Sequence, residues 1–274
     1  MRAIYSLAYL TYAPLSPPAC ITLAAKLGYQ AVGLRTLPGM PGTDYARLAD
    51  DAPLLRETQA RIRDTGVGVF DVEIIRLVPG FSIEAVKPFL AVCGALDAKA
   101  ILVAGDDPDE ARLIANYAAF CAAALPYGLT ADLEFMPWTT VCDAKTALRV
   151  VTAAAQPNGG ILVDALHAAR STTTFADLAA IPRRLLHYIQ ICDAPGGVPK
   201  TVPELLHTAR SERLLPGAGG IDLLGMFQVL PRDVPISIEL PNDVLKARLG
   251  IEEWSRQALA ATKNVLSSGL LDLH

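Results

Sequence analysis

Short, nearly continuous apolar runs alternate along the chain with longer stretches rich in alanine and leucine. A short apolar run bounded by glycine, proline or charged residues predicts a strand buried on both faces, and an amphipathic stretch predicts a helix that covers it. The predicted strands are Ala3–Leu10, Ala31–Leu34, Gly68–Ile74, Ala100–Ala104, Thr130–Glu134, Ile161–Asp164, His187–Cys192 and Ile236–Leu240. The predicted helices include Ser16–Leu27, Leu48–Thr65, Ile83–Leu96, Pro108–Leu125, Cys142–Ala155 and Ile251–Ser267.

Eight strands that alternate with helices in a chain of 274 residues predict an α/β fold, a parallel (β/α)8 TIM barrel that forms a single domain over residues 1–274. The open, doubly wound sheet shares this alternation and is the structural alternative. It is disfavoured because no GxGxxG motif follows the first strand. Polar residues also end several late strands, which suits a ring better than a single switch point.

Four late strands end in side chains that suit a hard metal ion, namely Glu134, Asp164, Gln190 and Glu239. The C-terminal ends of barrel strands share one mouth, where barrel enzymes place their chemistry. Carboxylate and amide oxygens suit Mg²⁺, Mn²⁺ or a similar oxygen-seeking cation. The pattern therefore predicts a divalent metal site at the mouth, with Asp132 as an alternative to Glu134. Asp164 is favoured because its strand is otherwise apolar, and a buried carboxylate must be paired, metal-bound or at the mouth.

Basic side chains near these strand ends are candidates for catalysis and substrate binding. His167 follows Asp164 by three residues, and an ordinary imidazole pKa of about 6.5 would let it exchange a proton at neutral pH. Arg170 lies on the same segment, and Arg76 stands at the end of the third strand; both are candidate substrate-binding residues. The other two internal histidines, at positions 187 and 207, are predicted to be structural.

The Pro- and Gly-rich segment Ala194–Gly220 is predicted to be an active-site loop after the seventh strand. Within it, Arg210 and Arg213 precede a glycine-rich turn, and their guanidinium groups suit a clamp for a carboxylate or phosphate. Such a clamp favours an acidic small-molecule substrate, because a neutral ketose has no use for it. Asp193 reaches the mouth only if the chain bends near Pro195.

Composition excludes several classes of protein. The chain is 52% hydrophobic with net charge −4 and no Lys/Arg cluster, so nucleic acid is not an expected partner. No stretch approaches the roughly 18 uninterrupted apolar residues of a spanning helix, which predicts a soluble protein without a membrane partner. Five widely spaced cysteines without a CxxC motif suit reduced thiols in a cytoplasm. The apolar composition also leaves room for a homo-oligomeric interface.

The ordered residues Glu134, Asp164 and Glu239, with the motif Asp164-x-x-His167, resemble the xylose isomerase-like barrel superfamily of sugar (phosphate) isomerases, epimerases and related enzymes. The resemblance covers essentially the whole chain. It implies that one divalent ion is held by residues on successive late strands. By resemblance to the epimerases, Glu134 and Glu239 would also handle protons, which makes them catalytic candidates beside His167.

Gln190 stands where the sugar epimerases carry a histidine. An amide oxygen is a harder ligand than imidazole, which favours Mn²⁺ or Mg²⁺, with Co²⁺ or Zn²⁺ also compatible. This glutamine, together with the segment Glu212–Gly219, is similar to the 3-dehydroshikimate dehydratases of the superfamily. Ala218 stands where we expect an acidic residue in that segment, so the substrate is left open.

These features predict a metal-dependent enzyme acting on a small polyhydroxylated carbonyl compound through a metal-stabilised enolate. If a β-hydroxyl is protonated by His167 or another acid and leaves as water, the enzyme is a dehydratase, and this lyase is favoured. If the proton returns to the opposite face or to the neighbouring carbon, it is a sugar isomerase or epimerase. An endonuclease IV-like enzyme is disfavoured because the chain has only four histidines. A non-catalytic binding protein is disfavoured by the intact carboxylates.

Overall fold

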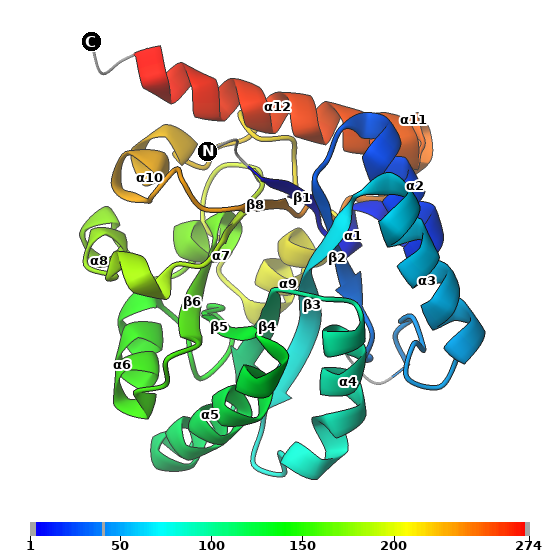
Figure 1. The fold of residues 1–274 in the computed structure, drawn as a ribbon. Helices are drawn as coiled ribbons and strands as arrows, with labels where there is room; N and C mark the ends of the chain where they lie inside the picture. The colour runs from blue at the N-terminus through cyan, green and yellow to red at the C-terminus, as the bar shows by residue number, and fades with distance from the viewer. Residues whose placement is uncertain (1–3, 40–41, 272–274) are drawn as a thin grey trace.

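Eight parallel strands close into a barrel, in which each strand pairs with the next and β8 pairs with β1 (Figure 1). The computed structural model describes residues 4–39 and 42–271. The strands are β1 (Tyr5–Leu7), β2 (Ala31–Arg35), β3 (Gly68–Leu77), β4 (Ala100–Gly105), β5 (Thr130–Glu134), β6 (Gly159–Asp164), β7 (Ile189–Ile191) and β8 (Ile236–Ile238). The predicted (β/α)8 barrel is confirmed.

Helices surround the barrel and cover its outer face (Figure 1). The surrounding helices are α2 (Pro17–Leu27), α3 (Ala52–Thr65), α4 (Ile83–Ala95), α5 (Glu110–Ala124), α6 (Ala144–Ala154), α8 (Phe175–Ala179), α10 (Leu223–Val229) and α12 (Ile251–Leu271). Shorter helices are α1 (Tyr9–Tyr12), α7 (Ala165–Arg170), α9 (Val202–Ser211) and α11 (Asp243–Leu249), with 3₁₀ turns η1 (Leu125–Tyr127) and η2 (Arg183–Leu185). Within the described part of the chain, none of these helices combines the length and apolar character that crossing a bilayer requires.

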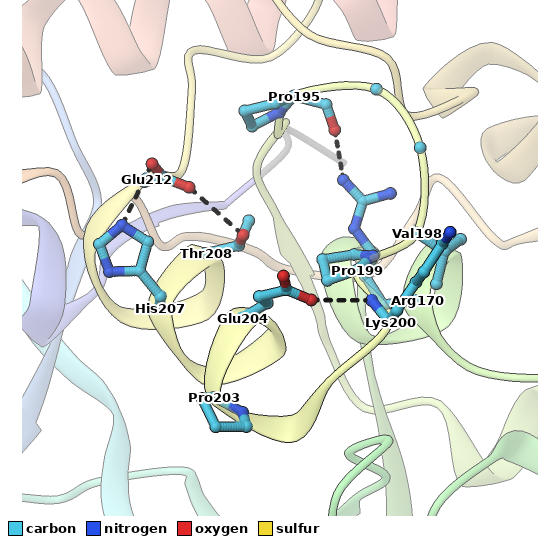
Figure 2. Close-up of a pocket in the computed structure, with 12 residues that line it drawn as sticks. Arg170, Pro195, Val198, Pro199, Lys200, Pro203, Glu204, His207, Thr208 and Glu212 are labelled. Carbon is cyan, nitrogen blue, oxygen red and sulfur yellow. Dashed lines mark hydrogen bonds and ion pairs between the residues drawn. The ribbon is translucent and has the colours of Figure 1, made fainter.

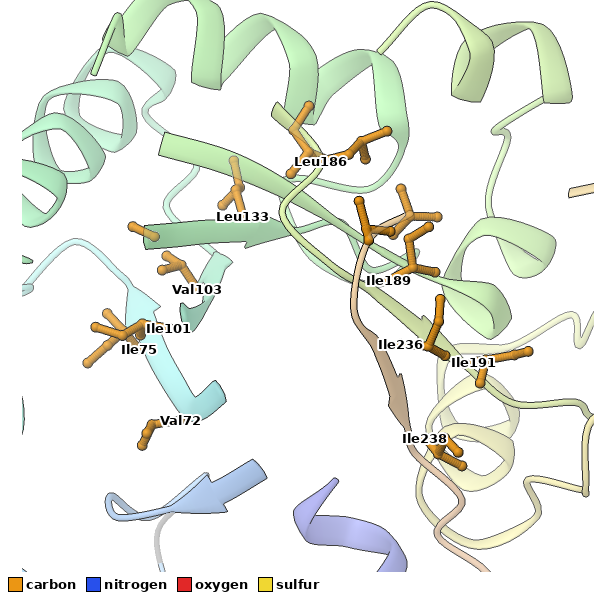
Figure 3. Close-up of a cluster of buried hydrophobic side chains, with 14 of the residues drawn as sticks. Val72, Ile75, Ile101, Val103, Leu133, Leu186, Ile189, Ile191, Ile236 and Ile238 are labelled. Atoms are coloured by element: carbon orange, nitrogen blue, oxygen red, sulfur yellow. The ribbon is translucent and has the colours of Figure 1, made fainter. Parts of the chain in front are cut away.

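The main hydrophobic core lies between the strands and the helices. Alternate strand residues point outward into it, among them Val72, Ile101, Val103, Leu133 and Ile189 (Figure 3). The intervening residues point into the barrel, where a smaller apolar cluster is formed by Ala100, Leu102, Leu162 and Tyr188. Both faces of the strands are therefore largely buried, which explains why the strands are mainly apolar runs in the sequence.

Two strands carry a pair of acidic residues on the inner face. The two-residue period sends Asp71 and Glu73 of β3 inward, and Asp132 and Glu134 of β5 inward as well. In each pair the first acid lies deeper and the second lies nearer the mouth. The deeper Asp132 is 2.7 Å from Nδ1 of His187, at the end of the barrel away from the mouth. Glu134 is thus the member of its pair that reaches the mouth.

The segment Ala194–Gly220 is not a simple loop, because it contains helix α9. Thr201 and Glu204 form a capping box at its start, in which each side chain accepts a hydrogen bond from the other residue's backbone N–H. Because its flanks are rich in proline and glycine, the whole segment is predicted from the sequence to be a loop. The first strand is also shorter than predicted, and its predicted start at Ala3 lies outside the described residues.

Asp193 fastens the glycine-rich turn to the end of β7. Its buried carboxylate accepts hydrogen bonds from the backbone N–H groups of Gly217 (3.0 Å), Gly219 (2.9 Å) and Ile221 (3.0 Å), and from that of Ala194 (2.8 Å). A Cβ atom at Gly219 would lie 2.2 Å from the carbonyl oxygen of Ala194, so only glycine fits there. The turn is therefore held rigidly beside the barrel mouth.

We expect Asp193→Asn to destabilise the protein by about 1–3 kcal/mol, because the new amide group would point N–H donors at backbone N–H donors. Urea unfolding followed by circular dichroism measures this as a lower midpoint. Asp50→Asn, on an exposed side chain that pairs with Arg47, is the matched control and should leave the midpoint unchanged. An unchanged midpoint for Asp193→Asn would contradict this account of the turn.

Candidate functional site

A small cavity of about 80 Å³ lies at the C-terminal ends of the strands. Its lining includes Glu73, Glu134, His167, Arg213 and Glu239. Helix α9 lies over the barrel opening, and its residue Ala209 completes the lining (Figure 1). The cavity is at the mouth that the sequence predicts to hold the chemistry.

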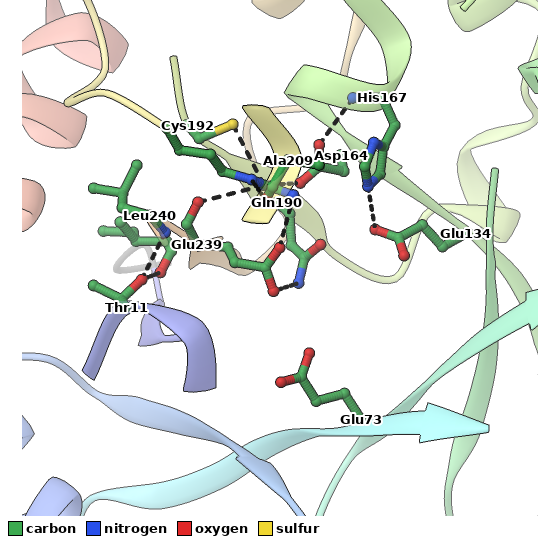
Figure 4. Close-up of polar contacts among 12 residues, drawn as sticks. Thr11, Glu73, Glu134, Asp164, His167, Gln190, Cys192, Ala209, Glu239 and Leu240 are labelled. Atoms are coloured by element: carbon green, nitrogen blue, oxygen red, sulfur yellow. Dashed lines mark hydrogen bonds and ion pairs between the residues drawn. The ribbon is translucent and has the colours of Figure 1, made fainter. Parts of the chain in front are cut away.

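Asp164 organises one side of the cavity because it both ends β6 and caps α7. Its Oδ1 accepts a hydrogen bond of 3.0 Å from the backbone N–H of His167, which starts the helix and places the imidazole over the site. Nε2 of His167 is 3.7 Å from Oε1 of Glu134 (Figure 4). Trp138 packs edge-on against the imidazole, with ring centroids 5.0 Å apart. Asp164, His167 and Glu134 are thus brought together as the sequence predicts.

Arg213 lies between two of the predicted metal ligands. Its guanidinium is 2.6 Å from Oδ2 of Asp164 and 3.1 Å from Oε2 of Glu239, and Nε donates to the carbonyl oxygen of Ala209 at 3.0 Å. The side chain is only 2% exposed. A buried charge of this kind needs close partners, and the two carboxylates supply them.

Gln190 reaches the same group from β7. Its Nε2 donates to Oε1 of Glu239 at 3.3 Å (Figure 4). Parallel pairing puts Gln190 beside Asp164 on one side and beside Ser237 on the other. Its Oε1 is buried and has no hydrogen-bond partner among the described residues. A buried acceptor without a partner calls for an explanation, and a bound cation would supply that partner.

The donor set at the mouth fits a divalent cation. One ligand atom each from Glu134, Asp164 and His167 lies within 4.8 Å of the others, and all three residues are buried. The unpartnered Oε1 of Gln190 adds a further oxygen donor. Carboxylate, amide and imidazole groups together suit Mn²⁺, Mg²⁺ or Zn²⁺. His167 enters this set, whereas the sequence predicts it as a catalytic residue only.

Burial and mutual repulsion control the ionisation of the carboxyl groups. Burial, with the nearby Asp164 and Glu239, raises the pKa of Glu134 well above its ordinary value. Burial raises the pKa of Glu239 to about 8, although Arg213 opposes the shift. Burial also acts on Asp164, but the Arg213 guanidinium and the contacts with His167 outweigh it and lower its pKa. Without a cation, the cavity therefore keeps protons on some of its acids.

His167 differs from the expectation of an ordinary imidazole. Burial, with the charge of Arg213, lowers its pKa to about 4, although Asp164 opposes the shift. The ring is therefore neutral at pH 7, and Nδ1 has no partner among the described residues. A neutral imidazole can bind a metal or accept a proton, but it is not charged in the resting protein.

The four predicted substrate-binding arginines divide into two groups. Arg76, Arg210 and Arg213 line the mouth cavity. Arg170 does not; it donates to the carbonyl oxygen of Pro195 and faces a separate cavity of about 630 Å³ between residues 195–200 and α9 (Figure 2). That second cavity also lies beside Lys200. Arg170 is thus set apart from the other three.

Two residues of the mouth escaped the sequence analysis as site residues. Glu73 is buried and lines the cavity, and Arg35 at the end of β2 forms an ion pair with it at 3.2 Å. The spacing Asp71-x-Glu73 in an otherwise apolar strand was an available signal, because residues two apart share the inner face. For Arg35, the sequence gives no comparable indication of a role in the site beyond its place at a strand end.

Comparisons with known proteins agree with the barrel fold. The family model described as "Xylose isomerase-like TIM barrel" matches residues 21–265. A curated 3-dehydroshikimate dehydratase of Pseudomonas aeruginosa is 27% identical over 143 residues, which cover 51% of this chain and 21% of that enzyme. The match thus spans about a fifth of the length of this curated relative.

Solved structures show the same fold. A fusion of a xylose isomerase-like TIM barrel with a 4-hydroxyphenylpyruvate dioxygenase has a TM-score of 0.83 at 18% identity, covering 100% of this chain and 44% of that one. The IOLI protein, solved with a bound zinc atom, has a TM-score of 0.78 at 19% identity, covering 97% of this chain and 98% of that one. At these identities the likeness shows the fold alone.

We expect the affinity for Mn²⁺ to rise as pH rises through about 8, because a cation must displace the protons that Glu134 and Glu239 retain below their raised pKa values. Titration calorimetry in buffers of different ionisation enthalpy measures the protons released. Glu239→Gln removes one of these protons and should flatten the pH dependence, whereas Glu110→Gln on the surface should not. Binding without proton release at neutral pH would contradict the raised pKa values.

Proposed function

Because the chain belongs to the xylose isomerase-like TIM barrel family, we propose that it is a divalent-metal-dependent lyase that dehydrates a small polyhydroxylated carbonyl compound related to 3-dehydroshikimate. The observation that carries the proposal is the convergence of Glu134, Asp164 and His167 in a buried cavity, next to the unpartnered Oε1 of Gln190. The relatedness to a 3-dehydroshikimate dehydratase supports the choice of substrate type.

Glu134, Asp164, Gln190 and Glu239 would hold the ion, as the sequence predicts, and His167 lies beside them with its imidazole left for proton transfer. A bound divalent ion supplies Lewis acidity toward a carbonyl or hydroxyl oxygen, and so makes the neighbouring C–H bond more acidic. Glu239 contacts both Gln190 and Arg213, so these two residues would orient its carboxylate. Oxygen donors predominate in this set, which favours Mn²⁺ or Mg²⁺.

His167 is suited to move the proton. Its imidazole is neutral at pH 7, so Nε2 can accept the proton from the carbon next to the substrate carbonyl. The resulting imidazolium has a low pKa and can give the same proton to the β-hydroxyl group, which leaves as water while the C=C bond forms. Trp138 covers the edge of the imidazole and limits its contact with solvent. No external oxidant or reductant is required.

An isomerase or epimerase acting on a sugar or sugar phosphate is the alternative. It is favoured by the presence of two carboxyl groups, Glu134 and Glu239, that line one cavity and have raised pKa values. Such groups can remove a proton from one carbon and return it to another position or face. Arg213 would then hold Glu239 in place without taking part in proton transfer.

We expect chelator-treated protein to be inactive on 3-dehydroshikimate and to form an aromatic product, detected by ultraviolet absorbance, after Mn²⁺ or Mg²⁺ is added. Glu134→Gln should lower kcat by about 100- to 10,000-fold, because it removes both a ligand charge and an acid–base group. Gln190→Ala should weaken metal binding. Glu110→Gln and Gln156→Ala change the same residue types outside the cavity and should retain wild-type activity.

Metal-loaded protein that leaves 3-dehydroshikimate unchanged would overturn the lyase proposal for this substrate. The alternative is then tested in D₂O, where an isomerase or epimerase exchanges the proton next to a sugar carbonyl for deuterium, as proton NMR detects. Protein that binds no divalent ion would refute both reactions.

A further inference from the structure

Four guanidinium groups line the mouth cavity, and only two of them have acidic partners among the described residues. Arg35, Arg76, Arg210 and Arg213 all lie on it. Two of them have acidic partners: Arg213 contacts Asp164 and Glu239, and Arg35 contacts Glu73. Among the described residues, no carboxylate pairs with Arg76 or Arg210. These two charges are available to a ligand.

Arg76 and Arg210 are held near each other and near Arg35. Nε of Arg76 donates to the carbonyl oxygen of Gly39 at 3.0 Å, which fixes the side chain and leaves its terminal nitrogens to the cavity. Arg210 lies in the last turn of α9, over the mouth. Partial burial, and then the positive charges of Arg76 and Arg35, lower the pKa of Arg210. Three like charges in one place repel one another unless an anion joins them.

Arg35 is held by contacts on several sides. Its guanidinium stacks over the ring of Tyr9, with Cζ 4.6 Å from the ring centroid. It also packs against Gly39, where a Cβ atom would lie 3.1 Å from Cζ. Its Nε is buried and has no hydrogen-bond partner among the described residues. Arg35 is thus held in place before any ligand arrives, and one donor remains unused.

With all four of its acids ionised, as metal binding requires, the mouth has a formal charge of zero before the metal is counted. Four acids and four arginines lie together, namely Glu73, Glu134, Asp164 and Glu239 with Arg35, Arg76, Arg210 and Arg213. A bound divalent ion would therefore leave a surplus of two positive charges. The surplus lies at Arg76 and Arg210, which lack acidic partners, and it favours an anionic ligand.

The topology separates this positive group from the metal ligands. Arg35 ends β2 and Arg76 is near the end of β3, whereas Asp164 ends β6 and Gln190 lies on β7. In a closed ring of eight strands, β2 and β3 stand opposite β6 and β7. Figure 4 shows Glu73, the partner of Arg35, on a strand apart from the group formed by Asp164, Gln190 and Glu239.

We propose that Arg35, Arg76 and Arg210 form an oxyanion subsite that binds the carboxylate or phosphate of a substrate whose carbonyl and hydroxyl groups face Asp164 and Gln190. The inference deepens the proposed function and rests on it, because it places the substrate at this mouth. It selects a substrate with an anionic group at one end and polar oxygens at the other. A neutral ketose would displace water from Arg76 and Arg210 without giving them an anionic partner. Binding of a neutral ketose is therefore disfavoured.

Binding, measured separately from turnover, tests the subsite. The probes are shikimate, which carries a hydroxyl where 3-dehydroshikimate has its ketone, the uncharged methyl ester of shikimate, and inorganic phosphate. Titration calorimetry on Mg²⁺-loaded protein gives each affinity. We expect shikimate to bind more tightly than its ester. Arg76→Gln and Arg210→Gln should each weaken shikimate binding by about tenfold, and the double variant by about a hundredfold, with the ester unaffected.

Arg149→Gln is the matched control, because Arg149 is an arginine on α6 that pairs with Glu110 outside the cavity. Phosphate that binds more tightly than shikimate, and is lost in the double variant, would identify phosphate as the oxyanion. Equal affinities for shikimate and its ester, without phosphate binding, would overturn the subsite, as would variants that weaken acid and ester alike. If 3-dehydroshikimate is not dehydrated but the preference for the acid persists and depends on Arg76 and Arg210, the lyase proposal fails and the subsite stands.

Discussion

The guanidinium of Arg213 makes it tolerable for several carboxyl groups to be buried within one small cavity. It contacts Asp164 and Glu239 and is itself almost wholly inaccessible to solvent. Ionised carboxylates at such depth repel one another and lack water, so each needs a compensating charge or a proton. The structure uses both solutions: Arg213 keeps Asp164 ionised, while burial favours the protonated form of Glu134. The remainder of the mouth is arranged around this balance.

The position of Arg213 depends in turn on the segment that follows β7. Asp193 binds the glycine-rich turn through three backbone N–H groups, and its backbone pairs with Leu214 in an antiparallel bridge. That bridge places Arg213, the preceding residue, beside the ends of β6 and β8. A feature that looks like a flexible Pro- and Gly-rich loop in the sequence is therefore a rigid support for the charged centre.

The sequence was sufficient for the barrel and for the strand ends that carry Glu134, Asp164 and Gln190, because buried strands are continuous apolar runs and a polar residue in them is conspicuous. The same argument would predict Glu73 as a site residue, but Glu73 lies within a longer strand and not at its end, so it is less conspicuous. The contacts of Arg213 could not be predicted, since they depend on how distant segments fold back. Nor could the low pKa of His167, because it results from burial, which spacing alone does not reveal.

Trp138 places a fluorescent side chain at the mouth of the barrel. The chain has only two tryptophans, and the other, Trp254, is buried with its indole N–H bonded to the carbonyl oxygen of Leu240. Trp138 instead lies at the rim of the cavity, edge-on to His167. Its fluorescence therefore senses the local environment of the imidazole, while Trp254 contributes a constant background. We therefore expect Trp138 to act as an optical reporter, whose emission would change when the cavity is occupied.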